Sequence, residues 1–527
     1  MNFEHAPSTN RQIARAAGTV MFALVISNLT GLLRQILVAG AFGTQADIDA
    51  FNAANRVSET LFTLIAGGAL ASAFIPVFTS LITHEKRRAA WKLASSVANL
   101  ILIALILAGI LAAIFAPWIV RNILAPGFVD NPAQEQLTVT LLRLMLPSAI
   151  LFGLSGLLMG VLNSNRIFFI PALAPAMYQL GMIFGLIVLV PYMGIYGLAW
   201  GVVIGAALHL GLQIPYLFRL QGKYYPTFGL DDPAVHEVVR LLLPRLFGVA
   251  VVQLNFWINT RIASRLTEGS LTGIVIAFAL MLVPQAAIAQ SVAIAAMPTF
   301  SAQVALGKLD QMRSSLAASL RGVLYLSVPA SFGLILLRQP IIKLLYQRGE
   351  FNERSTQLVA WALLWFTVGL VSHSLVEVLA RAFYALHDTR TPVLVGVAAM
   401  SLNVLLSFAF TALFAQIGWM PHGGLALANS VATSIEMGGL LVLMRGKLNG
   451  LEGRSIVIGA LKAFIAGGII FGLLWIWLAL TNGSPVWLVA LGGVVIGALV
   501  YGILLLVMGV REMRELVDAV LRRINFR

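Results

Sequence analysis

The sequence contains no cysteine and very little charge. Without cysteine the chain can form no disulfide, iron–sulfur cluster or thiolate zinc site. Charged residues make up only 11% of its 527 residues, whereas 59% are apolar. A water-soluble protein needs far more charge to cover its surface. The composition therefore indicates an integral membrane protein.

The common enzyme signatures are also missing. The seven histidines are scattered, there is no HExxH motif or paired-carboxylate cluster, and no glycine-rich loop ends in Gly-Lys-Ser/Thr. We therefore expect no catalytic residues, no metal and no cofactor, and a transporter rather than an enzyme. The net charge of +14 lies in short loops without a basic, aromatic-rich stripe, so no nucleic-acid partner is expected. The polar first dozen residues predict no cleaved signal peptide.

Long apolar runs recur along the chain. Crossing about 30 Å of hydrocarbon takes about 20 mostly apolar residues in a helix, and such runs occur from residue 14 to residue 509. They predict an all-α polytopic membrane protein with about fourteen transmembrane helices. The expected spans are 14–41, 51–82, 93–116, 137–162, 167–190, 194–218, 243–266, 271–297, 322–338, 357–385, 393–416, 425–444, 456–481 and 486–509.

Basic residues collect in alternate loops between these spans. Lys86, Arg87 and Arg88 form one cluster, and the end of the chain forms another. Because lysine and arginine favour the cytoplasmic side, both termini are predicted to be cytoplasmic. The expected segments are an N-terminus at 1–13, a first lobe at 14–218, a cytoplasmic linker at 219–242, a second lobe at 243–444, a helix pair at 456–509 and a basic tail at 510–527.

Two proline motifs repeat between the halves of the chain. FIPVFTS and AMPTFSA place Pro76 and Pro298 222 residues apart. Pro171 and Pro392, each near the opening of a span after a polar break, lie 221 residues apart. Two pairs with nearly one offset predict two pseudo-symmetric six-helix lobes in the same orientation, followed by two extra helices. The alternative is that the equal spacing of the two proline pairs arises by chance, because proline is common in the first turn of helices.

Charged residues inside the spans are the main candidates for function. An ionised group at the centre of a span costs about 2.5–3.5 kcal/mol on insertion scales. Arg34, Arg56, Arg143 and Arg261 lie in four different spans, all in the outer half of the membrane by the predicted topology. Polar stripes on two of these helices predict a cationic cavity between the lobes, because such faces are unfavourable against lipid. The stripes are Ser27, Thr30 and Arg34 on the first span, and Asn52, Arg56, Glu59 and Thr63 on the second.

The alternative for these arginines is a structural role. A long side chain can extend to the headgroups or pair with a nearby carboxylate, as Arg56 can with Glu59 three residues later. Glu377 and Arg381, four residues apart, are expected to form such a pair.

Several longer motifs identify a family. ASAFIPVF, LAPGF, NSNRIFFIPALAP, LLYQRGEF and ARAFYALHDTRTPV occur in this order, the last at 380–393. From about residue 15 to 510 the chain resembles the MviN/MurJ family of lipid II flippases, within the multidrug/oligosaccharidyl-lipid/polysaccharide exporter superfamily. The resemblance implies two six-helix lobes arranged in a V, with a lipid-tail groove on the last two helices. It also implies a multi-pass protein of the bacterial inner membrane.

The function implied by the resemblance is alternating-access transport of lipid II. The cargo would be the undecaprenyl-pyrophosphate-linked peptidoglycan precursor, moved from the inner to the outer leaflet for cell-wall synthesis, with membrane lipids as the other partner. Arginine suits such a cargo because its guanidinium can form bidentate contacts with phosphate. Other functions remain open. They are a flippase for another polyprenyl-linked oligosaccharide, a drug/cation antiporter, a membrane scaffold and a multispan glycosyltransferase.

The resemblance also assigns positions in this chain. Arg34 matches a cavity arginine of the family, Asp49 an acidic residue and Arg56 a basic residue of the second span. The chain departs from the family pattern by having neutral residues at Asn28, Gln35, Phe62-Thr63, Gly67 and Ala279. The predicted substrate-binding set is Ser27, Asn28, Arg34, Asp49, Arg56, Glu59, Arg143 and Arg261.

Overall fold

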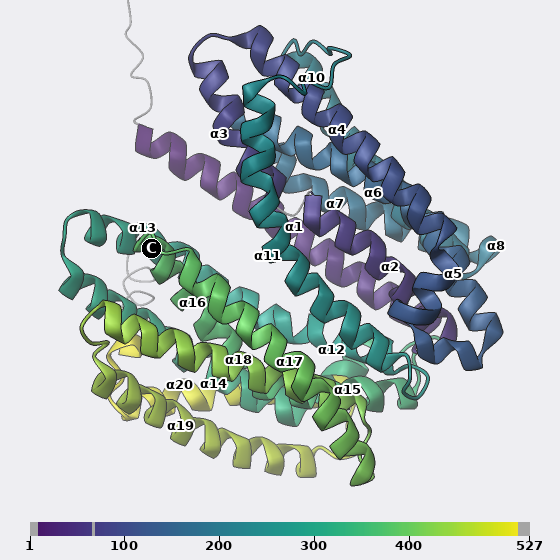
Figure 1. The fold of residues 1–527 in the computed structure, drawn as a ribbon. Helices are drawn as coiled ribbons and strands as arrows, with labels where there is room; N and C mark the ends of the chain where they lie inside the picture. Colours follow the sequence, from purple (N-terminus) through teal and green to yellow (C-terminus); the bar gives the residue numbers. More distant parts are fainter. Residues whose placement is uncertain (1–8, 66–68, 515–527) are drawn as a thin grey trace, which may run out of the picture. The chain divides into compact units, whose positions relative to one another are not determined.

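The structure is a computed structural model that describes residues 9–65 and 69–514 (Figure 1). The described residues form helices and connecting turns, without strands, which confirms the all-α prediction. The chain divides into two compact units, unit 1 from Met1 to Glu268 and unit 2 from Gly269 to Arg527. Most of the predicted basic tail and Gly67 lie outside the described residues.

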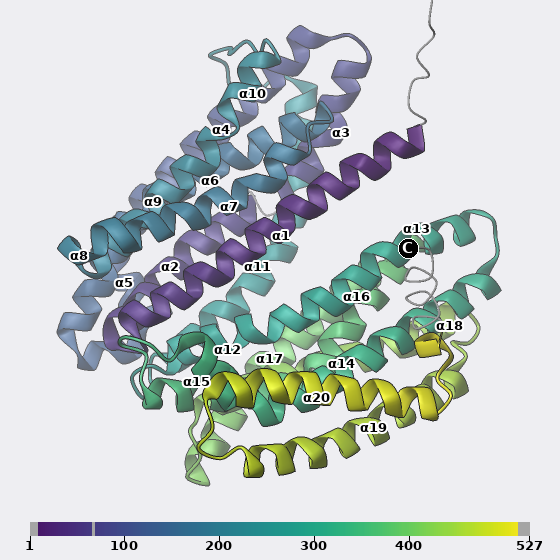
Figure 2. The same ribbon diagram turned by 180° about the vertical axis from the view of Figure 1, so that it is seen from behind.

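Unit 1 is built around α6 (Pro132–Ser164), which packs against α2, α3, α4 and α9 (Figure 2). The helix begins at a proline in its first turn, and Asn131 caps it by accepting a hydrogen bond from the Gln134 amide. The other helices of this unit are α1 (Thr9–Phe42), α2 (Ala46–Ile65), α3 (Ala69–Thr83), α4 (Arg87–Ile114), α5 (Ala116–Ile119), α7 (Phe169–Phe184), α8 (Val190–Met193), α9 (Ile195–Gly211), α10 (Ile214–Arg219) and α11 (Pro233–Ala263), with short π or 3₁₀ turns η1 (Val120–Leu124), η2 (Pro126–Asp130) and η3 (Gly185–Leu189).

Unit 2 is built around α14 (Leu309–Tyr346), which packs against α13, α15, α16, α19 and α20 (Figure 2). Its buried face includes Met312, Leu316, Leu320 and Val323. The other elements of this unit are α12 (Ser270–Gln285), the π turn η4 (Ala286–Gln290), α13 (Ser291–Ala305), α15 (Glu353–Val368), α16 (Leu370–Ala385), α17 (Arg390–Gln416), α18 (His422–Lys447), α19 (Gly453–Leu480) and α20 (Val486–Val507).

The described residues do not confirm the predicted count of about fourteen membrane spans. Among the described residues, 12 helices are long and apolar enough to cross a membrane, or 13 if α15 and α16, bent by 48°, form one span. The remaining predicted span, 51–82, corresponds to α2 and α3, on either side of residues 66–68. The structure therefore confirms a multi-pass helical protein but not the count of about fourteen.

Within unit 1, α11 packs against α2, α3 and α4. The division into lobes at 14–218 and 243–444, with the linker 219–242, stays a prediction from the repeat. The proline pairs occupy similar local positions in the structure. Pro76 and Pro298 both lie inside helices, and Pro171 and Pro392 are each the third residue of α7 and α17.

Glycines bring α7 and α9 unusually close. A Cβ atom added to Gly181 would lie 2.2 Å from the Gly205 Cα, and one added to Gly185 would lie 2.5 Å from the Gly201 Cα. These glycines are four residues apart on each helix, the small-residue spacing that lets membrane helices pack backbone to backbone. The close approach fixes the register of α7 and α9, which both contribute to the cavity described below.

Candidate functional site

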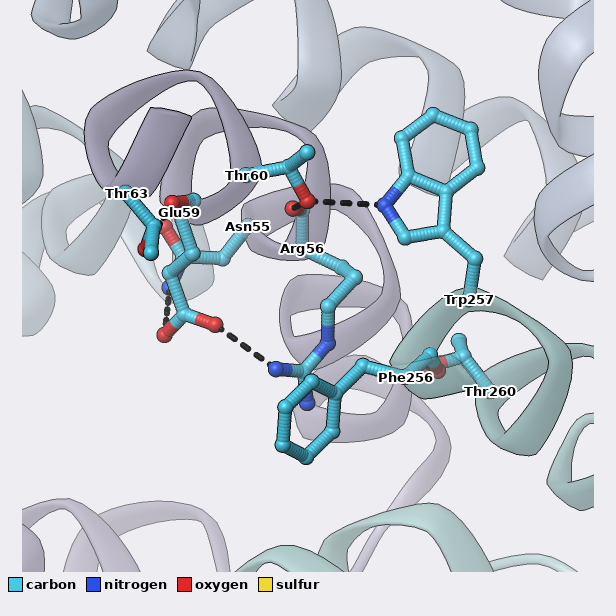
Figure 3. Close-up of polar contacts among 8 residues, drawn as sticks. All are labelled: Asn55, Arg56, Glu59, Thr60, Thr63, Phe256, Trp257 and Thr260. Carbon is cyan, nitrogen blue, oxygen red and sulfur yellow. Dashed lines mark hydrogen bonds and ion pairs between the residues drawn. The ribbon is translucent and has the colours of Figure 1, made fainter. Parts of the chain in front are cut away.

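The polar face of α2 carries the most prominent charged group of unit 1 (Figure 3). Arg56 Nη1 lies 3.0 Å from Glu59 Oε2, and the Asn55 amide donates to the other carboxylate oxygen at 3.0 Å. The Arg56 guanidinium carbon lies 5.2 Å from the ring centroid of Phe256 on α11, a cation–π contact. Trp257, the next residue of α11, donates to Thr60 Oγ1 at 2.7 Å (Figure 3).

The Arg56–Glu59 pair is only partly satisfied. The Arg56 side chain is 17% exposed and its Nε finds no acceptor among the described residues, while the Glu59 side chain is 48% exposed. The expected ion pair is thus present, and it leaves one buried guanidinium donor without an acceptor among the described residues and part of the Glu59 side chain exposed. A buried donor without an acceptor is costly. The pair therefore suits a ligand that offers both acceptors and donors.

A cavity of about 370 Å³ surrounds this pair. Five helices of unit 1 contribute to it: α2, α6, α7, α9 and α11. Aromatic rings form part of its wall, with the centroids of Phe62 and Phe152 4.5 Å apart and those of Phe152 and Tyr178 5.1 Å apart. The lining residues are Asn55, Arg56, Ser58, Glu59, Phe62, Thr63, Phe152, Pro175, Tyr178, Gln179, His209, Gln253 and Phe256.

Arg34 lies beside the same helix α7. Its Nη1 is 3.2 Å from the sulfur of Met182, one turn beyond Tyr178, and its buried Nε has no acceptor among the described residues. A thioether is a weak acceptor. This guanidinium is therefore poorly satisfied, although Arg34 itself is not among the residues that line the cavity.

His209 is a cavity residue that the sequence analysis did not single out. It is 1% exposed, and its Nδ1 lies 2.6 Å from Ser155 Oγ, which also accepts a hydrogen bond from Gln213 Nε2 at 2.5 Å. The Ser155 hydroxyl can donate to Nδ1 in the tautomer that carries its proton on Nε2. That Nε2 has no partner among the described residues.

A signal for His209 is present in the sequence. It continues the four-residue series Gly197, Gly201, Gly205 on α9, the stripe that packs against α7. A polar residue on a helix face that packs closely in the membrane is a functional candidate. Its partner Gln213 continues the same four-residue series, one step after His209. Ser155 lies on α6, 54 residues before His209, so periodicity alone does not reveal it.

Three other predicted site residues lie away from the cavity lining. Ser27 is buried on α1 and its neighbour Asn28 is exposed. Asp49, in the first turn of α2, is 3% exposed. An acidic residue in the first turn of a helix interacts favourably with the helix dipole.

Arg143 and Arg261 both bind main-chain carbonyls in unit 1. The exposed Arg143 donates from Nε to the Ala113 carbonyl, near the end of α4, at 2.9 Å. Arg261 donates to the Asn122 carbonyl in η1. These contacts hold helix ends together, and neither arginine lines the cavity with Arg56.

The motif ARAFYALHDTRTPV forms a connection between helices of unit 2. Asp388 accepts hydrogen bonds from the amides of Arg390 and Thr391 at 3.1 and 3.0 Å, and lies 2.6 Å from Lys447 Nζ at the end of α18. The hydrogen bonds from Lys447 and Thr391 hold the pKa of the Asp388 carboxyl well below its usual range. Glu377 and Arg381, in the same region, form the predicted ion pair.

An apolar groove of about 690 Å³ lies in unit 2. It is formed mainly by α14, α19 and α20, and α12 contributes Val283 and Pro284. Small residues such as Gly333, Gly493 and Gly497 open its floor, and leucines and isoleucines line its walls. Its chemistry suits a hydrocarbon chain.

Comparisons with known proteins give a consistent result. The family model described as "Lipid II flippase MurJ" matches residues 38–491. The chain is 30% identical over 430 residues to the Burkholderia cenocepacia protein named "Lipid II flippase MurJ", covering 80% of this chain and 82% of that one. It is 29% identical to the Rhizobium meliloti protein named "Probable lipid II flippase MurJ", covering 90% of this chain and 89% of that one.

Solved structures show the same relation. A structure titled "Lipid II flippase MurJ, inward closed conformation" aligns with a TM-score of 0.80 and 25% identity, over 94% of this chain and 99% of that chain. An inward-facing multidrug resistance transporter of the MATE family aligns with a TM-score of 0.68 and 14% identity, over 83% of this chain and 99% of that chain. The second match shows a shared fold alone.

Proposed function

Because the chain belongs to the lipid II flippase MurJ family, we propose that it moves lipid II from the inner to the outer leaflet of the bacterial inner membrane. The protein is a multi-pass membrane protein of a transporter family. In this proposal it works by alternating access and catalyses no reaction. Both termini are cytoplasmic, as the distribution of basic residues in the loops predicts.

The observation that carries the proposal is the pair of incompletely satisfied arginines in unit 1. Arg34 and Arg56 each have a buried Nε without an acceptor among the described residues. A pyrophosphate and an acidic peptide supply acceptors for guanidinium donors, and bidentate geometry favours arginine over lysine for this task. We propose that these two residues bind the anionic part of the headgroup.

The rest of the cavity fits a glycan. Asn55, Gln179 and Gln253 supply amide donors and acceptors, and Glu59 supplies acceptors. The Nε2–H of His209 is a further donor without a partner among the described residues. Aromatic walls with a few polar groups are typical of small-molecule sites. In this proposal the sugar hydroxyls and amides occupy the cavity beside the Arg56–Glu59 pair.

The remaining predicted substrate-binding residues take part less directly. Ser27, Asn28 and Asp49 belong to α1 and α2 together with Arg34 and Arg56, and we propose that they act in another step of the transport cycle. Arg143 and Arg261 position the ends of α4 and α11 through their carbonyl contacts. The prenyl tail is proposed to use the apolar groove of unit 2.

Complementation tests this function. The gene is expressed in a bacterial strain depleted of its own lipid II flippase, and growth is measured together with labelling of lipid II by a reagent that cannot cross the membrane. We expect growth and outer-leaflet labelling to return. Normal membrane expression without either signal would contradict the proposal and favour another polyprenyl-linked glycan as cargo.

A further inference from the structure

A second cationic pocket lies at one end of unit 2, and the cargo proposed above does not use it. It has a volume of about 680 Å³ and is formed by α14, the start of α19 and the residues that follow α20. Four cationic side chains and two carboxylates line it, an excess of two positive charges. These six residues are Arg321, Arg454, Lys462, Arg511, Glu452 and Glu512.

The carboxylates in this pocket already have partners. Arg321 Nε lies 2.7 Å from Glu512 Oε1, and Ser314 donates to Glu452. Lys462 Nζ donates to the Met508 carbonyl at 2.8 Å and has no carboxylate partner among the described residues. The exposed Arg454 side chain has no hydrogen bond or ion pair with that part of the chain. Within residues 9–65 and 69–514, the charges of Arg454 and Lys462 are therefore not neutralised.

This charged pocket adjoins the apolar groove. Tyr325 and Glu512 line both. Tyr501 lines the groove, is 4% exposed, and its hydroxyl has no hydrogen-bond partner among the described residues. The site thus combines a cationic mouth, an unsatisfied hydroxyl and a hydrocarbon-lined interior.

We propose that an anionic phospholipid binds here, with its phosphate against Arg321, Arg454 and Lys462 and an acyl chain in the adjoining end of the groove. Basic pockets between membrane helices are suited to anionic lipid headgroups, and guanidinium and ammonium groups form strong charge-assisted contacts with phosphate. The bound lipid bridges α14, α19 and the residues after α20. It therefore stabilises the attachment of the last two helices.

The position of the pocket favours a resident phospholipid over the cargo. The anionic headgroup of the cargo is proposed to meet Arg34 and Arg56, which belong to unit 1, whereas every residue of this pocket belongs to unit 2. The proposed function therefore leaves this pocket without a ligand, and binding of the carrier lipid here is one outcome of the test below. Phosphatidylglycerol has the required chemistry, one phosphate and two acyl chains, and phosphatidylcholine is a matched zwitterionic control.

Native mass spectrometry of the purified, delipidated protein tests the proposal. Phosphatidylglycerol adducts should persist at activation energies that remove phosphatidylcholine, and phosphatidylglycerol should raise the unfolding temperature more. Removing two charge-assisted contacts in the Arg454→Gln, Lys462→Gln double variant should weaken phosphatidylglycerol binding about tenfold or more. The charge control is Arg445→Gln. Arg445 is an exposed arginine in the last turn of α18, outside the pocket, so this variant should bind phosphatidylglycerol normally.

A groove variant separates the contribution of the acyl chain. No atom lies within 4 Å of a Cβ placed on Gly322, which lines the groove, so Gly322→Leu fills the groove without an immediate clash. It should also weaken phosphatidylglycerol binding, while Gly438→Leu, equally open but outside the groove, should not.

Three results would overturn the inference. One is equal retention of phosphatidylglycerol and phosphatidylcholine, and another is equal loss in the Arg445→Gln control. The third is undecaprenyl phosphate binding that exceeds phosphatidylglycerol binding and disappears in the same double variant, because this would assign the pocket to the carrier lipid.

Discussion

Arg34 and Arg56 illustrate what a sequence reveals about single residues in a membrane protein. Their charge within apolar spans marked both as candidates, and the structure leaves the Nε of each without an acceptor among the described residues. The same reasoning also selected Arg143 and Arg261, whose acceptors are main-chain carbonyls. Sequence periodicity cannot distinguish these cases, because it does not show which backbone groups a long side chain reaches.

The first prediction concerns Arg34. Replacing it with alanine removes both its charge and its fork of donors, whereas lysine keeps only the charge. Loss of a charge-assisted hydrogen bond costs about 1.5–3 kcal/mol, so Arg34→Ala should bind lipid II about tenfold or more weakly, with Arg34→Lys intermediate. Native mass spectrometry at equal amounts of folded protein measures this. Wild-type affinity in well-folded Arg34→Ala would return Arg34 to a structural role.

The second prediction concerns His209. His209→Phe keeps an aromatic ring against Phe62 and Phe152 but removes the Nε2 donor. Ser155→Ala disturbs the same buried network and leaves that donor in place. A neutral hydrogen bond contributes about 0.5–1.5 kcal/mol, so His209→Phe should bind lipid II several-fold more weakly than Ser155→Ala. Equal affinity in the two variants would show that His209 serves packing alone.

At the scale of helices, the sequence predicted the apolar runs well and their breaks poorly. Hydropathy located α4, α6, α17, α19 and α20, because each is a long apolar run. It gave no sign of the 48° bend between α15 and α16, because a bend leaves little trace in an average over a window. The π turns after α7 and α12 were likewise not predicted, since they depend on tertiary packing.

The third prediction tests the packing of α7 on α9. Gly181→Ala places a Cβ atom 2.2 Å from the Gly205 Cα, so the helices must separate. Overpacking of this kind costs about 1–3 kcal/mol, and the unfolding temperature in detergent should fall. Gly211→Ala is the matched control, because no atom lies within 4 Å of its added Cβ. Similar unfolding temperatures in the two variants would contradict the proposed close packing.

The fourth prediction is a pH dependence at the connection between α16 and α17, where Asp388 pairs with Lys447 at the end of α18. Because the folded-state pKa of Asp388 is depressed, its stabilising contribution is fully present above the unfolded pKa of about 3.9. It declines as the pH falls from there through the lower folded-state pKa. Asp388→Asn should therefore lower the unfolding temperature at pH 7, and the difference from wild type should shrink below about pH 4.

Asp310→Asn is the control for this pH dependence. The Asp310 side chain is 90% exposed in its ion pair with Arg313, and exposed pairs contribute little. Its unfolding temperature should match wild type at neutral pH. A difference for Asp388→Asn that is constant from pH 7 to pH 3 would exclude the proposed electrostatic cause.

At the scale of the whole molecule, the motifs carried more information than the physical pattern. Apolar periodicity establishes a helical membrane protein, and the position of arginines favours an anionic cargo. Neither distinguishes lipid II from another polyprenyl-linked glycan, because the headgroups share the pyrophosphate. The family match over residues 38–491 supplies that distinction. The predicted repeat of Pro76 with Pro298 remains a prediction that superposition of spans one to six on seven to twelve can test.

The central claim is that this protein transports lipid II by means of Arg34 and Arg56. The most direct measurement is translocation of labelled lipid II in liposomes whose only protein is the purified flippase. Whatever gradient transport requires is applied across the liposome membrane. Wild type and the Arg445→Gln control should move lipid II between leaflets, and the Arg34→Ala, Arg56→Ala double variant should not, at equal reconstitution. Translocation by the double variant at the wild-type rate would contradict the account.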